Sequence, residues 1–598
     1  MIGTMDTVIA PMRGTVVLIS VGQGDQVAEG QQLVVLESMK MEHVVAAPAA
    51  GRVGEIAVTV GETVRRDQVL LTVEPGVVTE AAQQPEQGTG DGIRRDLAEV
   101  LARRAAGLDA NRPEAVERRH RDGRRTAREN VDDLCDPGTF VEYGALAVAA
   151  QRQRRSMAEL VAKTPADGMV AGVAEINGRE SVVVAYDATV LAGTQGYYNH
   201  AKKDRMFELA ARRELPVVLF AEGGGGRPGD TDVQSVALLD APAFSLFARL
   251  SGRVPLVGVA AGRCFAGNAA LLGCCDVIIA TAGATIGMGG PAMIEGGGLG
   301  VVAPEDVGPM SVQVPNGVVD IPVADEAEAV RVAKQYLSYF GGAADEWSIV
   351  DQDRLRAAVP ANRVRAYDVR EVIDLIADAG SVLELRAGFG QGIHTALVRV
   401  EGRPMGLIAN NPGHLGGAID RDAADKAARF MQLCDSHGLP IVSLCDTPGF
   451  MVGPESEKTA TVRHFSRLFV IGANLTVPVC AVVLRKAYGL GAMAMFGGGS
   501  KIPCATVAWP TAEFGAMGLE GAVKLGFRRE LEAIADPVRR NETLEQMVAL
   551  AYERGKALNA ASMFEVDDVI DPAATRGWIA AALPKRVARG TRPNVDTW

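Results

Sequence analysis

Short runs of Val, Ile and Leu alternate with polar residues through the first 75 residues, and Gly or Asp separates the runs. The pattern of residues 10–37 returns without a gap at residues 47–74. The recurring pairs include Pro11 and Pro48, Gly14 and Gly51, Gly24 and Gly61, and Leu33 and Leu70. Alternation of this kind predicts short β-strands. Two similar copies predict an all-β domain over residues 1–75, a flattened barrel or sandwich with pseudo-twofold symmetry.

Residues 93–598 follow a different pattern, in which fully apolar runs lead into Gly-rich turns and then into stretches of helical spacing. Residues 215–226 are answered by residues 439–450, and residues 254–271 by residues 477–495. Apolar strands that alternate with helices predict βαβ units with both faces of the sheet covered. We therefore expect an α/β protein with two tandem domains of similar fold, residues 93–345 and 346–598.

Residues 76–92 read "GVVTEAAQQPEQGTGDG" and have no apolar periodicity, which predicts a flexible linker. Residues 94–128 are rich in arginine, and the helical spacing of Leu97, Val100 and Leu101 predicts a helix there. The simpler interpretation of these arginines is a charged surface or interface helix. The alternative is that some of them contact the phosphates of a coenzyme.

Charge narrows the choice of partners. The chain has 61 Lys and Arg against 73 Asp and Glu, a net charge of -12, which argues against broad binding to nucleic acid or anionic membranes. The apolar stretch 468–484 is interrupted by polar residues and Pro478, so we expect a helix end and a strand, and no membrane span. Eight cysteines without a CxxC pair indicate a reducing cytosol and no metal site. We expect a soluble cytoplasmic protein.

Two kinds of position carry candidate chemistry. Lys40, in "SMKMEHVVA", falls between the two β copies and is predicted at a hairpin tip, flanked by Met39 and Met41. Apolar side chains on both sides of a tip are costly to expose without a purpose. In the α/β part, Gly-rich turns before helices leave N–H groups free to hold a phosphate or a developing oxyanion.

Residues 5–75 resemble a biotinyl carrier domain, whose tip reads Met-Lys-Met, as Met39, Lys40 and Met41 do here. In the related lipoyl domains the lysine usually follows Asp, so Met39 favours biotin. The resemblance implies that a biotin protein ligase joins biotin to Lys40 through an amide. The product is a long tether that swings between sites.

Residues 93–598 resemble the carboxyltransferase (beta) subunits of biotin-dependent acyl-CoA carboxylases, such as those of acetyl-CoA and propionyl-CoA. In that family each half has the crotonase fold, a spiral of ββα units. The matching segments are "TARENVDDLCDPGTFVEYG" from Thr126, "AYDATVLAGTQG" from Ala185, "DKAARFMQLCDSHGLPIVSLCDTPGFMVG" from Asp425, "RKAYG" from Arg485 and "AWPTAEFGAMGLEGAV" from Ala508.

In this family two motifs form the oxyanion holes, which are pairs of backbone N–H groups that bind a negatively charged oxygen. Both motifs are altered here. Asp-Ser-Gly-Gly-Ala-Arg becomes Glu-Gly-Gly-Gly-Gly-Arg at residues 222–227, and Tyr-Gly-Gly-Ala-Tyr becomes Tyr-Gly-Leu-Gly-Ala at residues 488–492. The resemblance assigns the N–H groups of Gly224 and Gly225 to the thioester oxygen of an acyl-CoA. It assigns those of Leu490 and Gly491 to the ureido oxygen of biotin. If position 490 needs a positive φ, the second assignment shifts by one residue.

The family mechanism implies that carboxybiotin on Lys40 releases CO2, and that a biotin nitrogen then removes the α-proton of the acyl-CoA to give an enolate. Two anionic oxygens need two backbone holes, and no side-chain base is required. Met493 stands at a position that in the family influences acyl length, and Arg227 and Ala492 are grouped with it as a substrate pocket.

Other candidate residues have simpler interpretations. His414 in a Gly-rich turn could be a general base but is more often structural. Arg485 and Lys486 either support CoA or the dimer, or form a surface ion pair. Cys274 and Cys275 are expected to fill a core, and Ser443 lacks a G-x-S-x-G frame.

The chain has no ATP-binding motif, so ATP and magnesium are expected to act only through a separate biotin carboxylase subunit. The family implies a homodimer or a homohexamer built as a trimer of dimers. Two alternatives stay open. One is a transcarboxylase or decarboxylase acting on a malonyl-type CoA, and the other is a non-catalytic biotin carrier scaffold.

Overall fold

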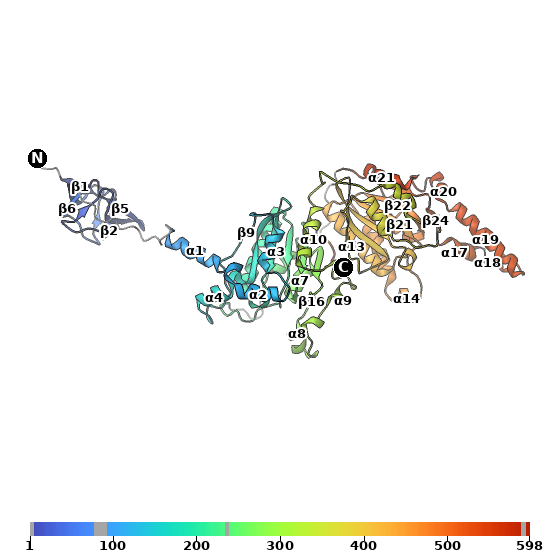
Figure 1. Cartoon of the computed structure of the whole chain (residues 1–598), viewed down its shortest axis with the longest axis horizontal. Helices are drawn as coiled ribbons and strands as arrows, with labels where there is room; N and C mark the ends of the chain where they lie inside the picture. The colour runs from blue at the N-terminus through green and yellow to red at the C-terminus, as the bar shows by residue number, and fades with distance from the viewer. Residues whose placement is uncertain (1–4, 77–92, 234–238, 586, 588–593) are drawn as a thin grey trace. The chain divides into compact units, whose positions relative to one another are not determined.

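The structure, a computed structural model, describes residues 5–76, 93–233, 239–585, 587 and 594–598 (Figure 1). The chain forms two compact units, Met1–Leu101 and Ala102–Trp598, and each is described by itself. Apart from Gly76, the predicted linker 76–92 lies outside the described residues.

The first unit contains two four-stranded antiparallel sheets, with strand orders β1-β8-β6-β3 and β5-β4-β2-β7. Apolar side chains that alternate along the strands, such as Val16, Leu33 and Leu70, are buried between the sheets. The predicted β-sandwich is confirmed. Its strands are β1 (Asp6–Ile9), β2 (Gly14–Ile19), β3 (Gln26–Val27), β4 (Gln32–Ser38), β5 (Met41–Ala46), β6 (Gly51–Ile56), β7 (Thr63–Val64) and β8 (Val69–Pro75).

The pseudo-twofold symmetry of this unit extends to its backbone hydrogen bonds. Gly24 donates its N–H to the carbonyl of Val53 at 2.8 Å, and Gly61 donates its N–H to the carbonyl of Val16 at 2.7 Å. Both glycines have a positive φ, +92° and +91°, at which another residue would be strained.

Three α-helices lie within residues 95–134, and the first of them confirms the helix predicted from the spacing of Leu97, Val100 and Leu101. They are α1 (Arg95–Ala105), α2 (Pro113–Arg121) and α3 (Ala127–Leu134). The start of α3 is fixed by a capping box, because the Thr126 hydroxyl accepts the N–H of Glu129 at 3.1 Å and the Glu129 carboxylate accepts the N–H of Thr126 at 2.7 Å.

The N-terminal half of the second unit is built on a seven-stranded sheet of order β17-β15-β13-β12-β11-β10-β9. The β10–β11 pair is antiparallel, and the pairs from β11 to β17 are parallel, as βαβ units require. The strands are β9 (Val141–Glu142), β10 (Met169–Ile176), β11 (Arg179–Tyr186), β12 (Val217–Phe220), β13 (Leu256–Ala260), β15 (Val277–Thr281) and β17 (Ile321–Val323), with a separate pair β14 (Arg263–Phe265) and β16 (Thr285–Gly287). The helices are α4 (Met157–Lys163), α5 (Tyr197–Arg213), α6 (Ala243–Ala248), α7 (Gly267–Gly273), α8 (Pro291–Gly296), α9 (Met310–Gln313) and α10 (Glu326–Ser338).

The C-terminal half repeats this plan in an eight-stranded sheet of order β18-β19-β20-β21-β22-β23-β25, with β24 paired to β22. Its strands are β18 (Leu383–Leu385), β19 (Ile393–Val400), β20 (Arg403–Asn410), β21 (Ile441–Thr447), β22 (Val479–Tyr488), β23 (Ala505–Ala508), β24 (Glu513–Gly515) and β25 (Asp568–Val569). Its helices are α11 (Leu355–Ala358), α12 (Val369–Ile376), α13 (Arg421–His437), α14 (Pro454–Glu457), α15 (Thr461–Ala473), α16 (Gly489–Met495), α17 (Leu519–Gly526), α18 (Arg528–Glu532), α19 (Pro537–Arg554), α20 (Ala557–Ser562) and α21 (Thr575–Ala582).

One hydrophobic core joins the two halves. It contains buried residues of the first sheet, such as Val183 and Val257, together with residues of the second, such as Leu397 and Ile441. Each sheet also covers a core of its own on the opposite face. The sheets are therefore buried on both sides, as the apolar strand pattern predicted.

The apolar stretch 468–484 forms the end of α15 and the first part of β22, so the helix-end and strand prediction is confirmed. Among the helices of the described residues, none combines the length and the apolar character needed to cross a membrane.

Candidate active site

Lys40 lies at the tip of the β4–β5 hairpin. Ser38 pairs with Met41 across the hairpin, and Met39 and Lys40 form the two-residue turn with φ of +54° and +65°. Two positive φ values are the mark of a type I′ turn, whose twist suits a hairpin. Met39 is 96% exposed and Met41 66%, and Lys40 is also exposed. The site fits an amide-linked biotin, because a modifying enzyme can reach the amine and both thioether side chains.

The N-half turn follows β12 and contains Gly223, Gly224 and Gly225. Gly223 donates its N–H to the carbonyl of Arg263 at 2.7 Å, and the carbonyl of Gly225 accepts the N–H of Gln195 at 2.7 Å. Within the part of the chain that the structure describes, the N–H groups of Gly224 and Gly225 have no acceptor. The turn is held at both ends, and its two central donors are free to bind an oxygen.

The C-half turn lies where β22 leads into α16. The positive φ, +57°, falls on Gly489 and not on Leu490, so the leucine is accommodated without backbone strain. A Cβ added to Gly491 would stand 2.6 Å from the Cα of Gly449, so this position must stay a glycine. Leu490 and Gly491 belong to the first turn of α16, where N–H groups have no intrahelical acceptor.

The structure brings two turns together in each half. A Cβ added to Gly225 would stand 2.8 Å from the Cβ of Ala266, the residue before α7, just as Gly491 abuts Gly449. Gly225 corresponds to Gly449 in the internal repeat, and Gly267 corresponds to Leu490. The predicted donors therefore represent one turn from each half. Sequence reasoning missed the other two, the start of α7 and the turn at Gly449, although the repeat itself pointed to them.

A carboxylate is clamped behind the first turn of each half. Arg119 binds Glu222 with two hydrogen bonds of 2.8 and 2.9 Å, and Arg124 lies 3.3 Å from the same carboxylate. In the C-half, Asp446 lies 3.2 Å from Arg485 and 2.5 Å from Lys486. Arg485 and Lys486 therefore hold a buried carboxylate, and the surface ion pair considered for them is wrong.

Tyr367 completes the clamp in the C-half. Its hydroxyl donates to Asp446 at 2.9 Å. Burial and the neighbouring Asp446 raise the pKa of Tyr367 well above its usual range, so the phenol stays protonated and remains a donor.

Of the eleven arginines in residues 94–128, five are paired with carboxylates of the second unit. Besides Arg119 and Arg124, these are Arg112 with Asp187, Arg125 with Asp133 and Arg128 with Glu142. These five arginines are taken up by intramolecular ion pairs, which favours the simpler interpretation of this segment over phosphate binding.

Arg227 closes the N-half turn. Its guanidinium is 4% exposed, pairs with Asp167 and donates to the carbonyl of Thr194 at 2.8 Å. These contacts tie the turn to the loop before α5. They occupy the side chain, and the place of Arg227 in a substrate pocket stays a prediction.

Ala492 and Met493 line a cavity of about 640 Å³ beside the start of α16. Met493 is 41% exposed. Its wall combines apolar with polar and charged side chains. The apolar ones include Ala487, Phe496, Phe514, Ala516, Ala560 and Met563, and the polar ones are Ser500, Arg554, Lys556 and Glu565. A flexible thioether beside the aromatic and aliphatic side chains of this wall suits an acyl chain.

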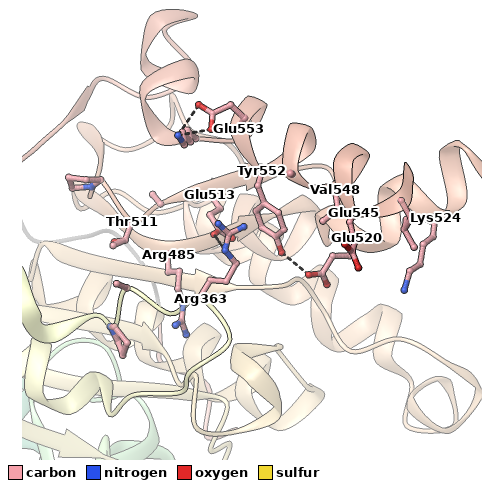
Figure 2. A pocket seen from close by; sticks show the side chains of 17 residues that line it. Arg363, Arg485, Thr511, Glu513, Glu520, Lys524, Glu545, Val548, Tyr552 and Glu553 are labelled. Carbon is pink, nitrogen blue, oxygen red and sulfur yellow. Dashed lines mark hydrogen bonds and ion pairs between the residues drawn. The ribbon is translucent and has the colours of Figure 1, made fainter. Parts of the chain in front are cut away.

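A larger cavity of about 860 Å³ lies between β24, α17 and α19 (Figure 2). Arg363 stacks on the ring of Tyr552 at 3.7 Å, and Tyr552 donates to Glu520 at 3.2 Å. Its lining carries acidic and basic side chains together and, of the candidate residues, includes Arg485. The smaller cavity, which adjoins the helix turn of the C-half, is the better candidate for substrate.

The remaining candidates have structural contacts. His414 lies 3.4 Å from Asp420, and the Ser443 hydroxyl donates to the carbonyl of Met495 at 2.7 Å in a fully buried position. Cys275 is buried in the outer core of the N-half, and Cys274 packs against that core. All eight cysteines are free thiols.

Comparison with known families agrees with this architecture. The carboxyl transferase domain family matches residues 118–592, and the biotin-requiring enzyme family matches residues 6–73. The 12S subunit of methylmalonyl-CoA carboxyltransferase from Propionibacterium freudenreichii is 36% identical over 496 residues, which cover 80% of this chain and 92% of that protein. The propionyl-CoA carboxylase beta chain of Saccharopolyspora erythraea is 32% identical over 514 residues, covering 81% and 92%.

Two solved structures support the same assignment. A single-chain, multi-domain long-chain acyl-CoA carboxylase is 58% identical with a TM-score of 0.79. The match covers 97% of this chain and 56% of that one, so this chain spans little more than half of its length. The transcarboxylase 12S crystal structure is 32% identical with a TM-score of 0.72, covering 83% and 95%. The chain therefore belongs to the carboxyl transferase family, with two crotonase-like halves preceded by an all-β domain of biotin-requiring enzymes.

Proposed function

We propose that this chain is the biotin carrier and carboxyltransferase of an acyl-CoA carboxylase, and that it transfers a carboxyl group to the α-carbon of an acyl-CoA. The observation that carries the proposal is a duplicated glycine-turn site in a chain that also presents Lys40 at an exposed Met-Lys-Met tip. Biotin joined to Lys40 would supply the chemistry of a mobile carboxyl carrier.

The roles of the residues follow from charge. Loss of the α-proton puts negative charge on the thioester oxygen, and the N–H groups of Gly224 and Gly225 are donors suited to hold it. Leu490 and Gly491 supply a second pair of donors for a second anionic oxygen, that of a ureido group. Fixed backbone donors need no reorganisation as charge develops, and each is worth about 3 to 4 kcal/mol in the transition state.

The substrate class we infer is a long-chain acyl-CoA. The cavity beside Met493 has about 640 Å³, and the apolar part of its wall, which includes Phe496, Phe514 and Met563, suits an alkyl tail. The 58% identity to a protein described as a long-chain acyl-CoA carboxylase supports the same choice.

The partners follow from the same proposal. ATP and magnesium would act in a biotin carboxylase, and a biotin protein ligase would modify Lys40. The transcarboxylase 12S structure is described as a hexamer, which supports a homo-oligomer here as well. Free thiols at all eight cysteines suit the reducing cytoplasm.

The direct test combines the biotinylated chain with a biotin carboxylase, ATP, bicarbonate and acyl-CoAs from acetyl to palmitoyl. We expect carboxylation that is strongest with the long chains. A Met493→Trp variant reduces the space in the cavity, so it should lower kcat/KM for palmitoyl-CoA at least 10-fold and leave acetyl-CoA within about threefold. No biotin-dependent carboxylation of any substrate would exclude the function, and equal losses on all chain lengths would exclude the tail site.

A transcarboxylase is the second candidate, because the chain is 36% identical to a methylmalonyl-CoA carboxyltransferase subunit. Turnover of a malonyl-type CoA with an acceptor acid, without ATP or a biotin carboxylase, would favour it.

A further inference from the structure

A buried lysine lies behind the N-half turn and has no role in the proposed chemistry. Lys203, on α5, is fully buried, and its Nζ lies 2.9 Å from the Tyr186 hydroxyl and 2.9 Å from the side-chain oxygen of Gln195. Among the described residues Lys203 forms no ion pair, and Asp204 and Asp167 are the carboxylates whose charges act on it. Burial lowers the pKa of this amine to about 7. Burying an amine without a carboxylate partner costs free energy, so its presence needs a reason.

The lysine is the start of a chain of hydrogen bonds that reaches both turns. The Gln195 amide donates to Asn268 at 2.5 Å, and Asn268, on the first turn of α7, donates to the carbonyl of Gly193 at 3.3 Å. The backbone of Gln195 meanwhile binds the other turn, since its N–H donates to Gly225 at 2.7 Å and its carbonyl accepts from Arg227 at 3.0 Å. One glutamine thus links the Gly225 turn to the start of α7.

The C-half builds the same backbone without this network. Ile419 takes the place of Gln195, and its N–H donates to the carbonyl of Gly449 at 3.0 Å while its carbonyl accepts from Met451 at 2.9 Å. In the internal repeat Lys203 corresponds to Ala427 and Asn268 to Gly491. The fold can therefore form these turns with apolar residues, and folding alone does not explain the polar set in the N-half.

We propose that Lys203 is a positioning residue of the N-half turn, which acts through Gln195 and Asn268 to hold the Gly224 and Gly225 donors against the start of α7. Because the Lys203 amine donates to the Gln195 side-chain oxygen, the Gln195 amide group is held with its N–H toward Asn268. This inference rests on the proposed function, because it concerns the donors assigned to the thioester oxygen.

The test transfers the C-half residues into the N-half as Gln195→Ile, Lys203→Ala and Asn268→Gly together. This triple variant removes the three polar groups of the network together, and it leaves the Tyr186 hydroxyl without its Lys203 partner. Circular dichroism and a thermal melt establish that the variant is folded before its kinetics are compared. We expect kcat for carboxylation to fall at least 10-fold with the KM for acyl-CoA within about threefold, because the donors act on the transition state. We also expect faster backbone hydrogen–deuterium exchange in residues 222–227 and 264–272.

Lys202→Met is the matched control. Lys202 is the neighbouring buried lysine, and its Nζ donates only to main-chain carbonyls, those of Ala166 and Met169. Its loss should lower thermal stability and leave kcat within about twofold. An equal fall of kcat in Lys202→Met would overturn the assignment, since any buried lysine would then do.

The two proposals fail separately. If the wild-type enzyme is active and the folded triple variant has an unchanged kcat, the positioning role is wrong and the proposed function stands. If the wild-type chain carboxylates nothing, the proposed function is wrong. In that case exchange still decides the inference, since unchanged exchange in both turns overturns it and faster exchange confined to them supports it.

Discussion

Whether a turn glycine can be replaced depends on its φ and on the space around it. Gly225 and Gly226, which are neighbours in one turn, differ in both. Gly225 has a φ of +86°, and an added Cβ would stand 2.8 Å from that of Ala266. Gly226 has no such φ, and nothing lies within 4 Å of an added Cβ. A side chain at the first position must move the donors, and one at the second need not.

We therefore expect Gly225→Ala to lower kcat for carboxylation roughly 100-fold. This corresponds to an activation free energy higher by about 3 kcal/mol, the cost of losing one oxyanion donor. Gly226→Ala, in the same turn, should keep most of the activity. Steady-state kinetics on both folded variants checks this. A Gly225→Ala enzyme with wild-type kcat would remove these donors from the mechanism.

Lys40 is tested by the conservative change Lys40→Arg, which keeps the charge and removes the amine that forms the amide. The intact mass of the variant should equal that of its own polypeptide without biotin. The variant should show no carboxylation through its own carrier domain, while added free biotin should remain a poor substrate. Intact-mass measurement and the carboxylation assay decide this. Biotin found on the Lys40→Arg chain would place the attachment at another residue.

At the scale of the element, the turn of the β4–β5 hairpin holds two residues in a backbone conformation that lowers the stability of the hairpin. Met39 and Lys40 both have a positive φ, which costs a non-glycine residue about 1 kcal/mol. A type I′ turn prefers Asn or Gly at these places, so the methionine is not there for the turn.

Met39→Gly should stabilise the hairpin by about 0.5 to 1 kcal/mol and slow biotinylation by the ligase, because the exposed thioether is lost. Hydrogen exchange of residues 32–46 gives the first effect, and a streptavidin-shift time course gives the second. A variant that is biotinylated at the wild-type rate would show that the ligase does not read Met39.

Much of the fold could be predicted from the sequence because it depends on local patterns of apolar and glycine residues. The repeat of residues 10–37 predicted the β-sandwich, and the Gly-rich turns after apolar strands predicted both sheets and the order of their parts. The same reasoning could not pair Gly225 with Ala266, or Gly491 with Gly449, because these contacts join turns separated by a whole βαβ unit. Nor could it assign Arg119 to Glu222, since an arginine's partner depends on tertiary packing and not on spacing.

At the scale of the whole molecule, ion pairs between elements set the response to acid. Glu384, on β18, binds Arg370 of α12 at 2.8 Å and His394 of β19 at 2.7 Å. Burial raises the pKa of the Glu384 carboxyl, but hydrogen bonds from His394 and Arg370 outweigh it and lower the pKa to about 2. A carboxyl with a lowered folded-state pKa stabilises the fold above its unfolded pKa, and that stabilisation is lost as the pH falls toward the folded value.

Glu384→Gln should therefore reduce the free energy of unfolding by about 2 kcal/mol at pH 6. The difference from wild type should narrow as the pH falls from about 4.5 toward 2. Urea midpoints of the second unit across this range check the slope. A difference that does not change with pH would mean that the pair is held by packing and not by charge.

Because the two sheets share one core, the protein cannot be divided between its halves into fragments that fold alone. Val183 in the N-terminal half and Ile441 in the C-terminal half are buried in the same core. A fragment that ends near residue 345 would therefore expose a broad apolar surface to solvent. We expect such fragments to precipitate alone and to recover solubility only when both are produced together. Although the two halves repeat one plan, we expect neither to fold without the other.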